Sequence, residues 1–334
     1  MDVLQQRGTS FNIGVGLGKL LKDLPIVKVM ENITKQEIEM EKMKSLYLAF
    51  APHLLEELRG LSEGLRLPFN KCAARFSGYD MPKVAAMGCS ALITKDYYVR
   101  NYDFSPVLYD GCFSLLQPNN AYATAGYNLQ AIGRHDGVNE HGLVAGLHFV
   151  SNDGYTEGLS AWTSIRMLLD TCQTVEDAIR LLEEIPHSAC YNFSLGDERG
   201  NTAVVEASPE KVRARRDEVL LTCVNHFQME ELQEKNRAFI ENSIKRNRYM
   251  QGLNSGEFSH KEMFHNFSDK HSPIFFTDYE NLFGTLHTFS YSFVDSRILT
   301  AIAQSNQVIE MDFRDWVGGT NLQETELIGF IENN

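Results

Sequence analysis

The feature that most constrains the fold is a change in residue pattern near residue 88. Over residues 35–65, apolar residues recur at helical spacing with charged residues between them, which predicts helix with an interruption at Pro52. After Met81-Pro82 the chain shows short runs rich in β-branched and aromatic residues, which predict strands. We therefore expect residues 1–88 to be mostly helical and the remainder to be rich in strands.

The strand-rich part begins with a predicted β-hairpin over residues 90–104, with its turn at Lys95-Asp96. Further strands are expected at 122–132, 142–150, 192–195, 202–206, 218–224, 285–294, 298–303 and 308–313. Helices are expected at 160–171, 174–184 and 229–253. Strands at hairpin spacing that flank pairs of helices favour antiparallel sheets covered by helices, which is a layered α+β arrangement.

Charge and composition exclude several classes of protein. The formal net charge of −13 argues against nucleic-acid binding, which needs clustered Lys and Arg. No stretch approaches the roughly 18 apolar residues of a spanning helix, and the N-terminus lacks the pattern of a signal peptide. The six cysteines contain no C-x-x-C pair, which indicates reduced thiols. We expect a cytoplasmic protein with no cofactor, no bound metal and neither nucleic-acid nor membrane partners.

Two motifs that could bind a ligand are better explained otherwise. Gly14-x-Gly16-x-Gly18 lacks the spacing and the preceding strand of a dinucleotide site, so we expect a glycine-rich turn. A cluster of possible metal ligands surrounds a turn-like segment and need not converge, so we expect solvated loop residues. The members of this cluster are His135, Asp136, Glu140, His141 and His148.

Gly88-Cys89 is the strongest candidate for chemistry, although a cysteine within a chain is usually a small buried residue. Glycine leaves the adjoining carbonyl uncrowded, and the return strand of the hairpin carries Arg100 and Asp103. A two-residue turn would place Cys89 opposite Tyr102 with Arg100 diagonal to it, whereas a three-residue turn would place it opposite Asp103. Either register brings a charged group near the thiol, where a cation would lower its pKa.

The residues around Cys89 resemble those of a known group of enzymes. Gly88-Cys89-Ser90, followed by residues 100–104 (RNYDF), is similar to the start of the mature chain in isopenicillin-N acyltransferases. It is also similar to choloylglycine hydrolases, which include bile-salt and penicillin V acylases. Both belong to the N-terminal-nucleophile (Ntn) hydrolases. Further similar segments follow in the family's order at 137–149, 197–206, 222–227 and 243–246.

This resemblance implies a four-layer αββα Ntn-hydrolase sandwich, with two antiparallel sheets between layers of helices. It implies that residues 1–88 are a helical pro-segment that becomes a small subunit, and that residues 89–334 are the catalytic domain. The long pro-segment favours the acyltransferase branch, whereas Arg100 fits the hydrolase pattern better. The chain would cut itself between Gly88 and Cys89, and the freed α-amine of Cys89 would then act as general base.

The resemblance also implies roles for other side chains. Asn225 would donate to the oxyanion, and Asp103 would accept hydrogen bonds from the α-amine. Arg100 and Arg246 would hold the charges around the thiolate, although Arg248 competes for the second position. His148 is a possible oxyanion or pocket residue.

The expected substrate is a small acyl amide or an acyl thioester such as an acyl-CoA, with the acyl group passing to water or to an amine. The cleaved fragments should stay together because amphipathic helices need an apolar partner, and a homo-oligomer is left open. One alternative is a non-catalytic relative that is never cleaved, which predicts an intact chain of 37.9 kDa. Another is a Cys-His peptidase that uses His141, His148 or His226.

Overall fold

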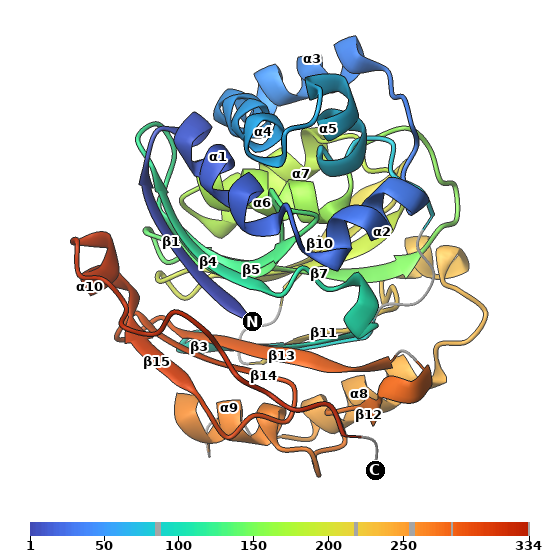
Figure 1. Cartoon of the computed structure of the whole chain (residues 1–334). Coiled ribbons are helices and arrows are strands. Elements are labelled where there is room, and N and C mark those ends of the chain that lie inside the picture. The colour runs from blue at the N-terminus through green and yellow to red at the C-terminus, as the bar shows by residue number, and fades with distance from the viewer. Residues whose placement is uncertain (84–87, 217–219, 254–257, 282, 333–334) are drawn as a thin grey trace.

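The computed structural model describes all residues except 84–87, 217–219, 254–257, 282 and 333–334, and the described strands form two sheets (Figure 1). The first sheet contains, in spatial order, β1 (Asp2–Gly8), β4 (Cys112–Pro118), β5 (Thr124–Leu129), β6 (Gly133–Asn139), β7 (Val144–Ser151), β8 (Cys190–Gly196), β9 (Thr202–Ala207) and β10 (Val212–Arg215). The second contains β11 (Leu221–Cys223), β2 (Gly88–Ile93), β3 (Tyr97–Phe104), β13 (Phe283–Ser292), β14 (Arg297–Ile302) and β15 (Ile309–Asp312), and β12 (Thr277–Asp278) pairs with β13.

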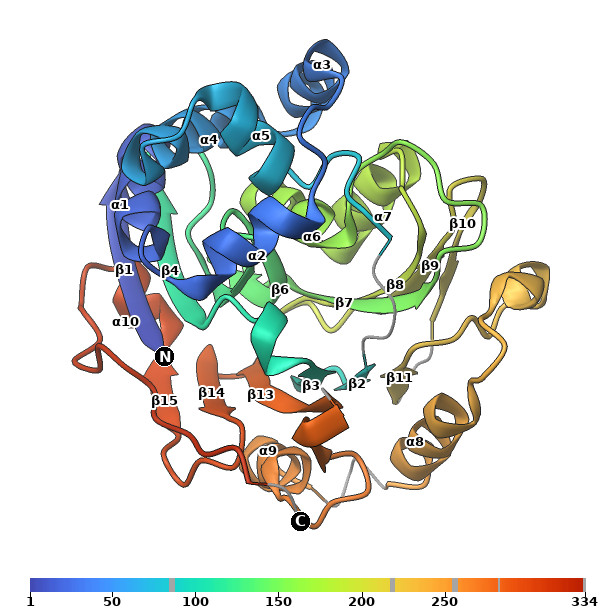
Figure 2. The same ribbon diagram turned by 45° about the vertical axis from the view of Figure 1, so that its right-hand side comes forward.

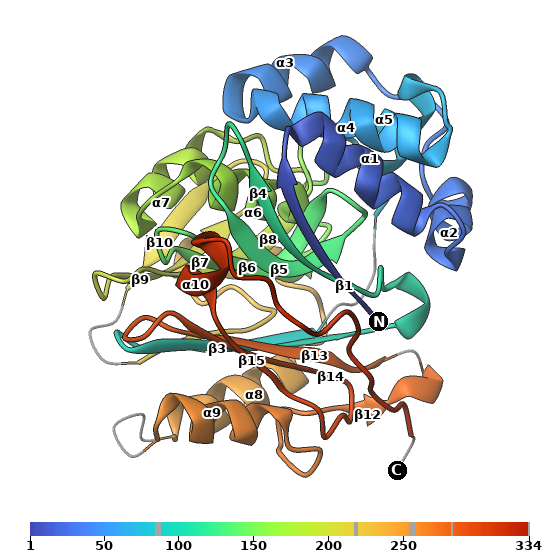
Figure 3. The ribbon, with the colours of Figure 1, turned by 60° about the vertical axis from the view of Figure 1, so that its left-hand side comes forward.

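Helices lie against the outer faces of both sheets. The first sheet is covered by α6 (Ala161–Thr171) and α7 (Val175–Glu184), and the second by α8 (Glu241–Gln251) and α9 (His260–Ser268). Beyond α6 lie the N-terminal helices α1 (Ser10–Leu21), α2 (Pro25–Ile33), α3 (Met40–Phe50), α4 (Pro52–Leu65) and α5 (Phe69–Phe76). Short helical turns complete the described chain at η1 (Pro106–Leu108), η2 (Glu230–Lys235), η4 (Tyr279–Asn281) and α10 (Phe313–Val317). Figure 3 shows this stack of helices and sheets from the side.

The two sheets face each other through a shared apolar core. Phe113 and Tyr127 of the first sheet pack in one buried cluster with Tyr98 and Phe289 of the second. The Tyr127 hydroxyl also bonds Thr300 Oγ1 across the two sheets at 2.6 Å. Side chains alternate between the faces of a strand, so each strand contributes every second residue to this core. The packing holds β2 against β7 and β8, and Figure 2 shows β2 and β3 between those strands and the lower helices.

The glycine-rich segment that we predicted as a turn lies inside α1, so that prediction was wrong. Its glycines let α1 pack closely against α4. A Cβ on Gly14 would lie 2.0 Å from the carbonyl oxygen of Glu57, and one on Gly60 would lie 1.9 Å from that of Phe11. The helix contact therefore requires residues without side chains, and the glycines serve backbone packing.

Residues 1–88 are not wholly helical, because they begin with strand β1. This strand pairs in parallel with β4, from Asp2 opposite Cys112 to Gly8 opposite Pro118. We expected antiparallel sheets, so the parallel pairing in the first sheet corrects that prediction. The polar side chains of β1 interrupt the apolar pattern that would have predicted a strand there. Gln5 uses its amide to bond with the C-terminal region, where its Oε1 accepts from Trp316 Nε1 at 2.9 Å.

The helix predicted over residues 229–253 is interrupted. The chain forms η2 and then α8, with Asn236 extended between them. The Asn236 side chain accepts from the Phe227 amide at 2.7 Å and donates to the Phe227 carbonyl at 3.1 Å. These bonds tie Asn236 to the preceding loop and compete with helix continuation, as asparagine side chains commonly do.

The segment around Gly137 that we predicted as turn-like belongs to strand β6, and the turn follows it at Glu140 and His141, where Glu140 is exposed as expected. Gly137 pairs with Gly126 of β5, where an added Cβ on Gly126 would lie 2.1 Å from the Asp136 carbonyl oxygen. Glycine in this strand marks a close backbone approach and not a turn. As a result, His135 and Asp136 are fully buried inside the molecule.

Most other predicted elements are present. The hairpin forms β2 and β3, the break at Pro52 separates α3 from α4, and the predicted strands of the C-terminal part correspond to β13, β14 and β15. Residues 218 and 219 of a predicted strand lie outside the described residues, and β11 follows them. Strands β4 and β10 and helix α9 were not predicted from the sequence. In the described residues, no helix combines the length and the apolar character needed to cross a membrane.

Candidate active site

The β2–β3 hairpin has the register of a two-residue turn. The Thr94 amide donates to the Tyr97 carbonyl at 2.9 Å, which closes the turn. Cys89 pairs with Tyr102, and Ala91 pairs with Arg100. The first of the two registers considered from sequence is therefore present, and it places Cys89 and Arg100 on the same face of the sheet.

The thiol of Cys89 is fully buried beside Arg100. Arg100 Nη2 donates to Cys89 Sγ at 3.1 Å and to the Leu147 carbonyl at 2.5 Å, while Nη1 is paired with Asp136 Oδ2. Burial raises the pKa of Cys89 to about 11, although Arg100 acts to lower it. The expected effect of the cation is present, because Arg100 acts to lower the thiol pKa, but desolvation of the thiolate is the larger effect.

The backbone of Cys89 is held by two other predicted residues. Its amide donates to Asn225 Oδ1 at 2.7 Å, and its carbonyl accepts from Arg246 Nη1. Arg246 Nη1 also donates to Ser90 Oγ at 2.8 Å, and Nη2 donates to Asn225 Oδ1 at 2.9 Å. Arg246 is buried on α8, whereas Arg248 is exposed, so it is Arg246 that lies at Cys89.

Asn225 presents its amide oxygen, and not its amide nitrogen, to Cys89. Its Nδ2 donates to the Phe149 carbonyl at 2.9 Å, and its backbone amide donates to Ser243 Oγ at 3.0 Å. The neighbours fix this orientation, because Oδ1 faces two donors and Nδ2 faces an acceptor. In the uncut chain Asn225 therefore orients the Cys89 nitrogen, and an oxyanion bond from Nδ2 would require release of Phe149.

Asp103 lies next to the bond expected to be cut, because it pairs with Gly88 across the hairpin. Its Oδ1 accepts from Thr285 Oγ1 at 2.7 Å, while its buried Oδ2 has no hydrogen-bond partner among the described residues. Burial raises the pKa of Asp103 to about 6, although Arg246 acts to lower it. The free oxygen can accept a hydrogen bond from a new amine at Cys89.

The histidines considered for a Cys-His pair have other partners. His148 Nε2 bonds Ser194 Oγ at 3.0 Å, His226 Nδ1 bonds Ser243 Oγ at 2.8 Å, and His141 packs edge-on against Tyr122. In the part of the chain that the structure describes, none of the three is hydrogen-bonded to Cys89 Sγ. The same part contains no group of three His, Cys, Asp or Glu side chains that could hold a metal ion.

Two residues near Cys89 were missed as site residues. Asp136 was considered only as a metal ligand, and His287 was not considered. Both are fully buried, and His287 Nε2 bonds Asp136 Oδ2 at 2.9 Å. The buried carboxylate on β6 could have been inferred only from a correct assignment of that strand, because its partners come from the other sheet.

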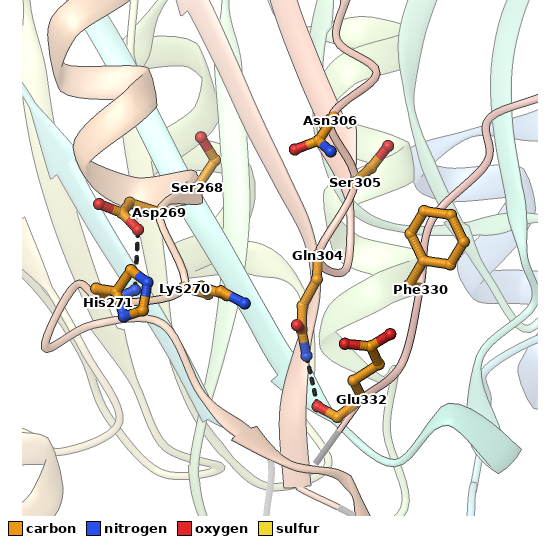
Figure 4. Close-up of a pocket in the computed structure, with 9 residues that line it drawn as sticks. All are labelled: Ser268, Asp269, Lys270, His271, Gln304, Ser305, Asn306, Phe330 and Glu332. Atoms are coloured by element: carbon orange, nitrogen blue, oxygen red, sulfur yellow. Dashed lines mark hydrogen bonds between the residues drawn. The ribbon is translucent and has the colours of Figure 1, made fainter. Parts of the chain in front are cut away.

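An open pocket of about 460 Å³ lies elsewhere, near the C-terminal end of the described chain (Figure 4). It lies between the end of α9, the turn after β14 and the C-terminal segment. Its lining residues are Ser268, Asp269, Lys270, His271, Gln304, Ser305, Asn306, Phe330 and Glu332. None of the residues around Cys89 lines it, so it is not part of the candidate active site.

Comparison with known proteins assigns the chain to a family. A profile of the family described as acyl-coenzyme A:6-aminopenicillanic acid acyl-transferase matches residues 93–307, which is more than half of the chain. The chain belongs to this family. The part that matches the acyl-transferase family contains Arg100, Asp103, Asn225 and Arg246, and it begins just after Cys89. No curated protein matches the chain by sequence.

Several solved structures are distantly similar to this member of the acyl-transferase family. A variant of conjugated bile acid hydrolase from Clostridium perfringens is 16% identical, with 74% of this chain and 97% of that chain covered and a TM-score of 0.44. Penicillin V acylase from Agrobacterium tumefaciens is 18% identical, with 68% and 86% covered and a TM-score of 0.38. The Caenorhabditis elegans ortholog of N-acylethanolamine-hydrolyzing acid amidase is 12% identical, with 61% and 93% covered and a TM-score of 0.43.

Proposed function

We propose that this chain is a self-processing N-terminal-cysteine amidohydrolase or acyltransferase, cut between Gly88 and Cys89. The observation that carries the proposal is the convergence of polar groups on one buried cysteine. Arg100 contacts its sulfur, Asn225 its nitrogen and Arg246 its carbonyl oxygen. An ordinary core cysteine behaves as a small apolar residue and needs none of these contacts.

The proposed cleavage begins when Cys89 Sγ adds to the carbonyl carbon of Gly88. The peptide C–N bond then breaks, the thiol proton passes to the Cys89 nitrogen, and a thioester joins Gly88 to the sulfur. Water hydrolyses this thioester, which leaves a carboxylate on Gly88 and a free amine and thiol on Cys89. The product carries a nucleophile and a base on one residue.

The new α-amine is then the general base. Its reference pKa is about 7.7–8.0, so much of it is neutral near physiological pH and can accept the thiol proton. Asn225 Oδ1 already accepts a hydrogen bond from this nitrogen, and Asp103 Oδ2 offers a second acceptor beside Gly88. Together the two acceptors would direct the lone pair of the amine towards Sγ.

The substrate class follows from the family and from this chemistry. The family description names an acyl-coenzyme A donor and an amine acceptor. We therefore propose a small linear amide or acyl thioester as substrate, which forms an acyl-enzyme at Cys89 that water or an amine resolves. Asn225 would donate to the oxyanion after exchanging its bond to Phe149, and His148 would line the pocket.

Intact-protein mass spectrometry under denaturing conditions tests the cleavage, with Cys89→Ala as the control. Two fragments whose masses sum to the full chain plus one water, the larger beginning at Cys89, support the proposal if the variant stays whole. A wild-type chain that remains uncut would instead favour the non-catalytic relative. Acyl amides and acyl-CoA thioesters, assayed with and without added amines, then separate hydrolase from acyltransferase.

A further inference from the structure

A chain of hydrogen bonds crosses from the Cys89 thiol into the other sheet. Arg100 of β3 reaches Cys89 Sγ at 3.1 Å with one nitrogen and Asp136 Oδ2 of β6 with the other. The same Asp136 oxygen bonds His287 Nε2 of β13 at 2.9 Å, and His287 Nδ1 bonds the Tyr109 hydroxyl at 2.7 Å. All of these side chains except that of Tyr109 are fully buried.

The chemistry of the donors and acceptors fixes where the protons lie. The Asp136 carboxylate can only accept, so His287 carries its proton on Nε2, and its Nδ1 accepts from the Tyr109 hydroxyl. Burial lowers the pKa of His287 more than Asp136 raises it, so the imidazole is neutral. Burial would raise the pKa of Asp136, but His287 and Arg100 hold it at about 2. Asp136 and Arg100 therefore form an ion pair with no net charge.

We propose that Asp136, held in place by His287, is a positioning residue that aims Arg100 at Cys89 Sγ and cancels the guanidinium charge there. This inference rests on the proposed function of Cys89 as nucleophile. A buried guanidinium without a counter-ion would stabilise the thiolate of Cys89 more strongly and lower the pKa of the thiol. With Asp136 as counter-ion, Cys89 keeps its proton until the reaction provides an acceptor for it.

Other groups around Cys89 do not replace Asp136 in this role. The titratable and charged side chains that face Cys89 are Arg100, Tyr102 and Asp103 of β3, His148 of β7, Cys223 of β11, Arg237 in the segment before α8, and Arg246 of α8. Among them Arg100 is the group that contacts the sulfur, and burial together with Arg100 dominates the thiol pKa. The carboxylate that neutralises Arg100 therefore controls that pKa indirectly.

The test is the pKa of Cys89, measured from the ultraviolet absorbance of the thiolate as pH rises, with the Cys89→Ala chain as blank. Asp136→Asn keeps the shape and an acceptor oxygen but removes the charge, so the thiol pKa should fall by about one unit or more. His287→Phe preserves the ring stacked on Tyr127 at 3.7 Å but removes a donor to Asp136. The carboxylate is then no longer held in place against Arg100, so the thiol pKa should fall, by less than in Asp136→Asn.

A matched control is present in the same fold. Asp170 of α6 also accepts from a buried arginine and a buried histidine, Arg166 at 2.8 Å and His53 at 2.8 Å, on the helix side of the first sheet. Asp170→Asn makes the same chemical change and should leave the thiol pKa unmoved. In an Arg100→Gln background, Asp136→Asn should also have no effect, because the group through which it acts is gone.

The outcomes separate this inference from the proposed function. An unmoved or raised thiol pKa in Asp136→Asn, or a shift that persists without Arg100, would overturn it. If Asp136→Asn does not fold, His287→Phe decides: a fall in the thiol pKa supports the inference, and a rise or no change overturns it. None of these readings needs cleavage or turnover, which intact mass and amide assays report separately.

Discussion

At the scale of single residues, the candidate site depends on polar groups buried around Cys89. Arg100, Asp103 and Asn225 are fully buried, and Arg246 nearly so. Buried charges are costly unless they are paired or hydrogen-bonded, so groups of this kind are retained where they perform a task. Their arrangement gives two predictions.

The first prediction concerns Arg246, which bonds the Cys89 carbonyl and Asn225 Oδ1. Hydrogen bonds from charged groups contribute about 1.5–3 kcal/mol, which corresponds to roughly 10- to 100-fold in rate. Arg246→Gln should therefore slow self-cleavage by that factor, measured as the time course of fragment appearance by mass spectrometry. The exposed Arg248 provides the control, because Arg248→Gln should cleave at the wild-type rate. Equal slowing in both variants would contradict the assignment.

The second prediction concerns the pH dependence of stability. Burial raises the pKa of Asp103 from 3.8 to about 6, so between these values the folded chain binds a proton that the unfolded chain has released. The stability that this bound proton contributes is fully present below pH 3.8 and is lost as the pH rises through about 6. Asp103→Asn removes this loss, which amounts to about 1–3 kcal/mol.

This effect is measured by urea unfolding at pH values below and above that window. The Cys89→Ala background keeps the chain in one piece, so that unfolding stays unimolecular. The difference in unfolding free energy between the two pH values should be smaller in Asp103→Asn. An unchanged difference would show that Asp103 titrates at its ordinary pKa.

At the scale of elements, the sequence predicted those segments whose pattern is local. Helix α7 is an example, because it lies within the predicted range 174–184, and Thr174 and Asp177 bond each other's backbone groups at its start. The hairpin could be placed, but its register depended on a turn length that the sequence left open. Strand β1 was missed because its polar side chains bond with residues that are distant in the sequence. Strand β6 was missed because its glycines, which suggested a turn, pack closely against the neighbouring strand.

The same limit applies to the site. Cys89, Asp103, Asn225 and Arg246 could be proposed because they lie in ordered motifs, and the structure places them together. The link from Arg100 to Asp136 joins two sheets, and no spacing in the sequence encodes it. Sequence motifs thus indicated the candidate nucleophile Cys89, whereas its electrostatic environment could be described only from the tertiary structure.

The third prediction concerns the contact between α1 and α4. Gly60→Ala places a methyl group 1.9 Å from the Phe11 carbonyl oxygen, so the helices must separate. Overpacking of this kind costs about 1–3 kcal/mol, against a gain of about 1 kcal/mol in helix propensity. Thermal unfolding should show a net loss of stability. Gly252→Ala, at the end of α8 where the nearest atom is 3.3 Å away, should show little change.

At the scale of the whole molecule, residues 1–88 are bound to the remainder by buried charges. Glu57 of α4 accepts from Arg166 of α6 at 2.7 Å, and both side chains are fully buried. His53 of α4 bonds Asp170 of α6 at 2.8 Å. These contacts are the physical reason to expect that the fragments remain together after cleavage.

The fourth prediction follows from that contact. Glu57→Ala leaves Arg166 buried without one of its two carboxylate partners, a change that costs about 3–5 kcal/mol. The cleaved fragments of this variant should separate at lower urea than those of the wild type, as measured by size-exclusion chromatography. Lys42→Ala removes an exposed pair with Glu157 across the same boundary and should have almost no effect. Equal separation in the two variants would show that the buried pair does not hold the fragments.

Strand β1 has a further consequence for how the chain is made. It is among the first parts of the chain to leave the ribosome, yet its partner β4 begins at Cys112. During synthesis β1 therefore stays unpaired until more than a hundred further residues have emerged. Pairing between segments this far apart in the sequence is slow to form. If cutting at Gly88 came before that pairing, the released segment would lack its attachment to the sheet. Under the proposed cleavage, we therefore expect the pairing of β1 with β4 to form before the bond between Gly88 and Cys89 is cut.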